Sequence, residues 1–328
     1  MLEHGLHKTQ VDHYVFVKRY NEGDFLILLL YVDDKLVITQ YIKRIVSLKK
    51  ALGKSFSMKD LWPAKQILGM HIVWDRTKNM LWLSQKKYGT KVLERSNMCK
   101  AKPVGSTLSV NCKINARQCL RGEMDKAKMK KVSYASTIGS LMYVMVFTRS
   151  NIAFAVRMVS LYMSNPWREH WAAIKWILKY LKGASRVCLR YGFGKPMLRG
   201  FTNSYMSGDI DSSRSTSGYV MTYAGGAMSW QSRLQKSVAL STTEVEYMAT
   251  IKARKELIWM RNFLRELGMK QERFLLHYDN QSVIHLAKNA AYHSRTKHIH
   301  RSITNYVRKW MRMSLPLWRS ILMIMDQT

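Results

Sequence analysis

Acidic residues are scarce in this sequence of 328 residues. It holds 21 Asp and Glu against 54 Lys and Arg, which leaves a formal net charge of +33. A surface this basic repels itself and attracts polyanions, so nucleic acid is the first partner to consider. The alternative is a basic surface that is merely solvated and has no dedicated partner.

Cysteine and long apolar runs are also lacking. The cysteines include no CxxC pair and have no zinc-ligand spacing, so we expect reduced thiols. They are Cys99, Cys112, Cys119 and Cys188. No apolar run reaches the roughly 18 residues that a membrane span needs, and the opening segment MLEHGLHKTQ lacks the apolar core of a signal peptide. We therefore expect an intracellular chain, cytoplasmic or nuclear, without a membrane partner.

The apolar content, in contrast, is ordinary. Hydrophobic residues make up 47% and charged residues 23% of the chain, as in globular proteins, which argues against wholesale disorder. A chain of this length can form two or three compact units, each with its own core. Residues 1–100 alternate short apolar runs with turns, and residues 41–52 have helical spacing that ends at Gly53. This pattern predicts an α+β segment.

The middle of the chain, residues 101–195, is predicted to be a linker followed by helices. Residues 101–130 are polar and lysine-rich and contain Pro103 and Gly105, so we expect a loop there. Three segments with helical spacing follow, at residues 134–147, 151–163 and 167–181. Apolar residues on one face of each helix would form a shared core.

The last third of the chain mixes both patterns. The expected elements are strands at residues 198–205, 218–223, 227–231 and 274–278, and helices at residues 242–267, 282–288 and 295–310. Gly225-Gly226 marks a tight turn between two of the strands, and Gly268 ends the longest helix. This order predicts an α/β unit, one mixed sheet flanked by helices, over residues 196–312. Residues 313–328 are expected to form an irregular tail.

One short motif carries chemistry of its own. Tyr31-Val32-Asp33-Asp34 lies between two apolar runs of strand length. A hairpin would hold the two adjacent carboxylates rigidly at its tip, as polymerases present ligands to divalent cations that bridge nucleotide phosphates. Taken by itself, a turn with two aspartates is more often simply solvated.

The context of this motif points to a known family. FLILLLYVDDKLVIT resembles the palm hairpin of reverse transcriptases, and its neighbours resemble, in the same order, copia-type LTR retrotransposon Pol polyproteins. These neighbours are HGLHKTQVDHYVFVK, MKDLWPAKQILGM, LWLSQKKY, KVLERSNM, YASTIGSLMYVMVFTRSNIAFAV, HWAAIKWILKYLKG, GAMSWQSRLQKSVALSTTEVEYMA and SRTKHI. The resemblance covers about residues 5–308, and so many ordered motifs make it specific.

The resemblance implies a fold and a domain order. Residues 1–100 would be a truncated reverse transcriptase palm, residues 101–195 a linker with a helical thumb or connection, and residues 196–312 a ribonuclease H-like domain. It also implies that Asp33 is a metal ligand and Asp34 its neighbouring carboxylate. A complete palm needs a further aspartate from an earlier strand and the fingers, both expected upstream of this sequence. Without them, polymerase activity is not expected.

The resemblance further implies a ribonuclease H site in which four carboxylates hold two Mg²⁺ ions, or Mn²⁺ in their place. The helix motif STTEVEYMA retains Glu246, with Glu244 as the less favoured candidate, and the motif HYDNQS retains Asp279. Asn203 and His300 stand where the family has aspartates. An amide is a weak magnesium ligand, and imidazole suits zinc, copper or iron better. We therefore expect metal binding at Asp33, Glu246 and Asp279 to be weak or lost.

Other residues near these motifs could be considered as substitutes for the two lost carboxylates. Tyr205 also replaces a usual aspartate of the family, whereas Asp209 and Asp211 are acids that the family carries in addition to its ligands. His298 and His300 could hold a softer metal, but neighbours two apart on a helix point to different sides. We expect ordinary buried or exposed histidines instead.

Three hypotheses for function remain open. The first is a retrotransposon-derived reverse transcriptase and ribonuclease H fragment, by descent synthesising DNA on RNA and cleaving RNA in RNA–DNA hybrids, but inactive here. The second is a non-catalytic basic module that binds nucleic acid, and the third is a residual nuclease using Glu246, Asp279 and a substitute acid. The expected partner is an RNA–DNA hybrid or duplex, and pairing with an intact polymerase subunit stays open.

Overall fold

The structure is a computed structural model. It describes residues 5–20, 24–61, 63–109, 112, 114–116, 127, 129–278 and 317–319. By internal contacts the chain divides into two compact units, of which the first is Met1–Lys65 with Glu256–Arg273 and the second is Gln66–Lys255 with Phe274–Thr328. Each unit combines segments from distant parts of the sequence.

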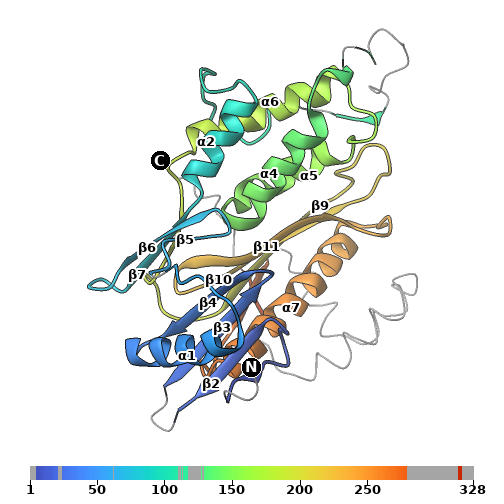
Figure 1. Ribbon diagram of the computed structural model, residues 1–328. Coiled ribbons are helices and arrows are strands. Elements are labelled where there is room, and N and C mark those ends of the chain that lie inside the picture. Colours follow the sequence, from blue (N-terminus) through green and yellow to red (C-terminus); the bar gives the residue numbers. More distant parts are fainter. Residues whose placement is uncertain are drawn as a thin grey trace, which may run out of the picture. The chain divides into compact units, whose positions relative to one another are not determined.

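The first unit is built on an antiparallel sheet with strand order β1-β2-β3-β4. Its elements are β1 (His7–Lys8), β2 (Val15–Arg19), β3 (Phe25–Tyr31), β4 (Asp34–Thr39) and α1 (Ile42–Ser55). Figure 1 shows α1 beside the strands of this sheet. On that face Leu26 and Leu28 pack with Leu48 and Leu52 of α1. The helix predicted at residues 41–52 is therefore confirmed, and it runs past Gly53 to Ser55.

The other face of this sheet is covered by the end of the long helix α7 (Thr242–Glu266). Val17 and Ile27 pack against Leu267, with Phe263 nearby. Trp259 Nε1 donates a hydrogen bond to the Val11 carbonyl at 3.2 Å. Burial on both faces explains why β3 is continuously apolar rather than alternating.

The second unit contains the three helical segments predicted for the middle of the chain. They are α4 (Tyr134–Thr148), η3 (Ser150–Ile152) with α5 (Ala153–Ser160), and α6 (Arg168–Gly183), and α2 (Lys86–Arg95) is a further helix that was not predicted. One core cluster joins them through fully buried side chains such as Ile138, Val156 and Ile177. The segment predicted as a helix at residues 151–163 starts with a 3₁₀ turn, and its α-helix ends at Ser160.

A second antiparallel sheet explains why the first unit ends at Lys65. It consists of β5 (Gln66–Ile67), β6 (Met70–Asp75), β7 (Met80–Ser84) and β8 (Leu189–Tyr191), in that order. β8 pairs Leu189 with Leu83, so a segment after α6 completes a sheet begun before α2. Local patterns do not reveal a pairing this distant in sequence.

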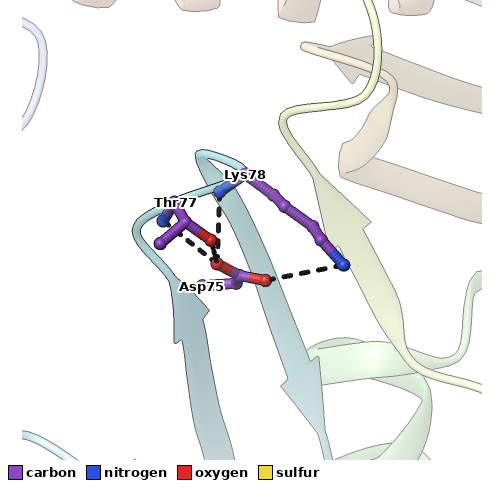
Figure 2. A network of polar contacts seen from close by, with 3 residues as sticks. All are labelled: Asp75, Thr77 and Lys78. Carbon is purple, nitrogen blue, oxygen red and sulfur yellow. Dashed lines mark hydrogen bonds and ion pairs between the residues drawn. The ribbon is translucent and has the colours of Figure 1, made fainter.

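The hairpin between β6 and β7 is held by one carboxylate. Figure 2 shows Asp75 Oδ1 accepting hydrogen bonds from the Thr77 backbone N–H, the Thr77 hydroxyl and the Lys78 N–H at 3.0, 2.6 and 3.1 Å. Lys78 Nζ lies 4.0 Å from Asp75 Oδ2. The hydrogen bond from the Thr77 side chain and that from the Lys78 backbone lower the pKa of Asp75.

The third sheet is mixed, as predicted. Its strands are β9 (Arg199–Tyr205), β10 (Thr216–Tyr223), β11 (Gly226–Leu234), β12 (Leu275–Tyr278) and β13 (Leu317–Arg319). β11, β10 and β9 are antiparallel neighbours, and β12 and β13 continue the sheet in parallel. The turn between β10 and β11 is formed by Ala224 and Gly225, both with positive φ, one residue before the position expected.

One expectation about the tail is wrong. Residues 317–319 form a strand that pairs with β12, with Leu276 opposite Leu317, whereas residues 313–328 were expected to be irregular. The pairing depends on a partner some forty residues away, so no local repeat announces it. The helices predicted at residues 282–288 and 295–310 lie outside the described residues.

Candidate functional site

The polymerase-like motif forms the hairpin that the sequence predicts. Tyr31 pairs with Asp34 across β3 and β4, which leaves Val32 and Asp33 as the two turn residues. Val32 has a φ of 51° and is 88% exposed. A positive φ at the first turn position only is typical of a type II′ turn, which suits a two-residue hairpin. Both carboxylates therefore stand exposed at the tip.

The acid of the long helix lies against the opening strand of the mixed sheet. Glu246, in the second turn of α7, is 9% exposed. Its Oε1 accepts a hydrogen bond of 2.7 Å from the hydroxyl of Ser204 in β9. The helix motif and the strand motif, some forty residues apart, thus meet at one point.

The residue that meets Glu246 is not the one that the family pattern suggests. Asn203 and Tyr205 are exposed and flank Ser204 in β9. Successive strand residues point to opposite faces, so these two side chains leave the face that Ser204 shares with Glu246. Asn203 Oδ1 accepts a hydrogen bond from the Ser204 N–H at 2.7 Å, and the Tyr205 ring packs edge-on to Phe154 at 6.2 Å.

Glu244 has a local structural role. Its Oε2 accepts a hydrogen bond from the Leu240 N–H at 2.9 Å, and its own N–H donates to Ser241 Oγ at 3.2 Å. Ser241 thus caps the helix, and the Glu244 carboxylate reaches back to the N–H of Leu240, one residue before the cap, in a variant of the capping box that the spacing Ser-Thr-Thr-Glu favours. Glu244 therefore serves the start of α7, and Glu246 stays the preferred ligand as a prediction.

Asp209 and Asp211, the candidate substitutes for the lost carboxylates, have other partners. Asp209 is buried and accepts a hydrogen bond from the Ser212 hydroxyl. Asp211 accepts hydrogen bonds from the Ala116 N–H at 2.9 and 2.7 Å and from the Tyr162 hydroxyl at 2.8 Å. Asp211 therefore fastens the linker to the helical part of the second unit.

The sequence reasoning missed the rest of this linker attachment. His170 Nδ1 accepts a hydrogen bond from the Trp167 N–H at 3.0 Å, its Nε2 lies 3.3 Å from the Asn115 carbonyl, and its ring stacks on Tyr162 at 4.0 Å. Burial lowers the pKa of His170, which favours the neutral ring that these contacts need. A histidine three residues after a helix-capping position is the sequence signal that could have revealed it.

The remaining predicted ligands fall outside the described residues, namely Asp279 and His300, together with His298. His277 is described, and its ring stacks on Phe201 at 4.9 Å. Burial and the nearby Arg199 lower its pKa, as expected for a packed histidine. Within the described part of the chain, no group of three or more His, Cys, Asp or Glu side chains is placed to hold a metal ion.

Two further expectations concern the cysteine thiols and membrane-spanning segments. Cys99, Cys112 and Cys188 are free thiols, and Cys119 lies in a part that the structure does not describe. None of the described helices is both long and apolar enough to cross a bilayer.

Comparison with known proteins agrees with the motif order. The family model of reverse transcriptase (RNA-dependent DNA polymerase) matches residues 1–109. The retrovirus-related Pol polyprotein from transposon TNT 1-94 of Nicotiana tabacum is 52% identical over 89% of this chain, which spans only 22% of that polyprotein. An uncharacterized mitochondrial protein of Arabidopsis thaliana is 32% identical over 71% of this chain and 93% of its own length.

Among solved structures, the foamy viral protease-reverse transcriptase dRH in complex with double-stranded DNA aligns with 61% of this chain and 35% of its own. Its sequence identity is 12% and its TM-score is 0.34, a score too low to establish a shared fold. The sequence relatives are decisive instead. The chain belongs to the copia-type retrotransposon Pol polyproteins, and it contains part of their reverse transcriptase region.

Proposed function

We propose that this chain is a reverse transcriptase and ribonuclease H fragment that binds nucleic acid and does not catalyse. The observation that carries the proposal is the contact at the candidate ribonuclease H site. There the carboxylate of Glu246 hydrogen-bonds the hydroxyl of Ser204, while Asn203 and Tyr205 on either side provide no acid.

The donors do not fit a pair of divalent metal ions. Two Mg²⁺ ions carry a charge of +4, which the ribonuclease H chemistry implied by the family balances with four carboxylates. In this chain Asn203 and His300 replace two of them. Glu246 and Asp279 would leave the metals poorly neutralised in surroundings that are already strongly basic, so we derive no metal-dependent step for this site.

The exposed Asp33 and Asp34 support the same proposal for DNA synthesis. They stand at the tip of the β3–β4 hairpin, and no third acid joins them among the described residues. An in-line displacement at two metals needs further anionic ligands. Primer extension by this chain alone is therefore not expected, and an intact polymerase subunit would have to supply the further ligands.

Nucleic-acid binding is supported by charge. With a formal charge of +33, lysines and arginines on the surface can neutralise phosphates of an RNA–DNA hybrid or duplex without a base code. The second candidate function, a basic binding module independent of any enzymatic descent, depends on the same charge.

A salt titration tests this binding. The logarithm of the binding constant for a hybrid should fall linearly with the logarithm of the salt concentration, and a slope near zero would exclude binding through phosphates.

The test of inactivity is a hybrid-cleavage assay in Mg²⁺ and in Mn²⁺. The chain should leave the RNA strand intact, and an active relative should cleave it under the same conditions. Cleavage that Asp279→Ala abolishes would overturn the proposal and establish a residual nuclease. Cleavage that Asp279→Ala leaves unchanged would indicate a contaminating nuclease, to be removed before the assay is repeated.

A further inference from the structure

A pocket in the second unit lies between the helices α4 and α5 and the strand β11. Its volume is about 540 Å³, within the roughly 300–1,000 Å³ of small-ligand sites. β11 is the terminal strand of the mixed sheet, with β10 as its neighbour on the other side. Residues that line the pocket include Met142, Met145, Val156, Arg157, Trp230 and Arg233.

One wall of the pocket is apolar and fixed. Met142 and Met145 come from α4 and Val156 from α5, and Trp230 faces them from β11. Trp230 Nε1 donates a hydrogen bond of 3.0 Å to the Met145 carbonyl, which holds the indole in place. Methionine side chains adapt to flat or irregular apolar ligands, so this wall suits a planar group such as a base.

Two cations, Arg157 and Arg233, also line the pocket. Arg157 is half-buried, and its pKa is lowered by burial and by the charge of Arg233, while Asp209 raises it. The pKa of Lys252 is lowered by burial and again by Arg233. The charge of Arg233 therefore acts against the charges of both Arg157 and Lys252. Like charges brought together are destabilising unless an anion joins them.

Asp209 offsets part of this repulsion, because its charge raises the pKa of Arg157. Its carboxylate is buried and also accepts a hydrogen bond from the Ser212 hydroxyl. The ion pairs of Asp24, Asp60 and Asp75 involve Arg44, Lys49 and Lys78 instead of the pocket arginines. A phosphate matches the arrangement, because guanidinium groups form paired hydrogen bonds with its oxygens.

We propose that this pocket binds one unpaired nucleotide of a nucleic-acid strand, with its phosphate on Arg157 and Arg233 and its base against the wall of Trp230 and the methionines. The inference rests on the proposed function, since it assumes that the chain binds nucleic acid. An apolar wall beside two cations combines base stacking with phosphate neutralisation, which is how single strands are held. The internal bases of a duplex are stacked on both faces, so they cannot reach this wall, whereas an unpaired nucleotide can.

The test compares two labelled ligands by fluorescence anisotropy, a blunt RNA–DNA hybrid and the same hybrid with a short single-stranded overhang. Arg233→Gln, at an exposed position, and Arg157→Gln should weaken overhang binding about tenfold more than blunt binding, because each removes a charge-assisted contact to the phosphate of the unpaired nucleotide. Lys175→Gln, which removes an exposed charge of α6 outside the pocket, should weaken both ligands equally and only slightly.

Each outcome has one meaning. Equal losses for both ligands in the arginine variants would overturn the inference and leave the arginines as general phosphate contacts. Displacement of the overhang ligand by laurate, but not by a mononucleotide, would overturn it in favour of a fatty-acid site. No binding of either ligand by the unmodified chain would instead refute the proposed function. Thermal melts of the three variants show whether each is folded.

Discussion

Ser204→Ala removes the hydroxyl that donates a 2.7 Å hydrogen bond to Glu246 Oε1. Glu246 is only 9% exposed, so water replaces that donor poorly. A hydrogen bond to a charged group contributes about 1.5–3 kcal/mol, and a buried acceptor that loses its donor costs a comparable amount. We therefore expect Ser204→Ala to lower the free energy of unfolding by about 2 kcal/mol, measured by urea denaturation at neutral pH.

A double-mutant cycle isolates the contact from the loss of packing. In the Glu246→Gln background the acceptor is neutral, so Ser204→Ala should cost only about 0.5–1.5 kcal/mol. Ser204→Thr keeps the hydroxyl and serves as the matched control. Equal costs of Ser204→Ala in both backgrounds would refute the view that this hydroxyl acts on a carboxylate at the candidate site.

Three further predictions concern the same two units. His300→Asp should lower the melting temperature without metal, because the family resemblance places the added carboxylate with Glu246 and Asp279, and like charges repel; an unchanged or higher midpoint would contradict this. Asp75 has a lowered folded-state pKa, so its stabilisation should be present above its ordinary value of 3.8 and vanish as the pH falls through the lowered value. Denaturation of Asp75→Ala and the unmodified chain across this range should therefore converge at low pH, and a constant difference would argue otherwise. Val32→Gly should raise stability by about 1 kcal/mol in thermal melts, since a β-branched residue at a φ of 51° is strained.

Much of the fold follows from local patterns in the sequence. The apolar runs around Asp33 and Asp34 predicted the β3–β4 hairpin, and helical spacing predicted α4, α6 and α7 nearly to their ends. These signals are strong because each element repeats its own period over a turn or more.

What the sequence did not reveal depends on pairing over long distances. β8 completes a sheet with β7, β13 extends a sheet from the tail, and α7 belongs to both compact units. A strand of three residues has too little pattern to be recognised, and its partner is chosen by the free edge of a distant strand.

The candidate site was predicted in part. The family resemblance predicted Glu246 near the strand that contains Asn203, and in the structure Glu246 of α7 lies against that strand and contacts Ser204. The residue that meets Glu246 is Ser204 and not its neighbour Asn203. Neighbouring residues in a strand point to opposite faces, so this shift of one residue changes which side chain faces the site. The capping role of Glu244, by contrast, was already readable in its spacing from Ser241.

The most direct test of the account is a calorimetric titration of the chain with Mn²⁺. The account predicts no binding of a pair of ions in the submillimolar range, because an asparagine and a histidine stand in for two acids. His300→Asp should strengthen binding of an ion at Glu246 and Asp279, and adding Asp279→Ala should remove it again. Two ions bound tightly by the unmodified chain, and released in Asp279→Ala, would contradict the central claim.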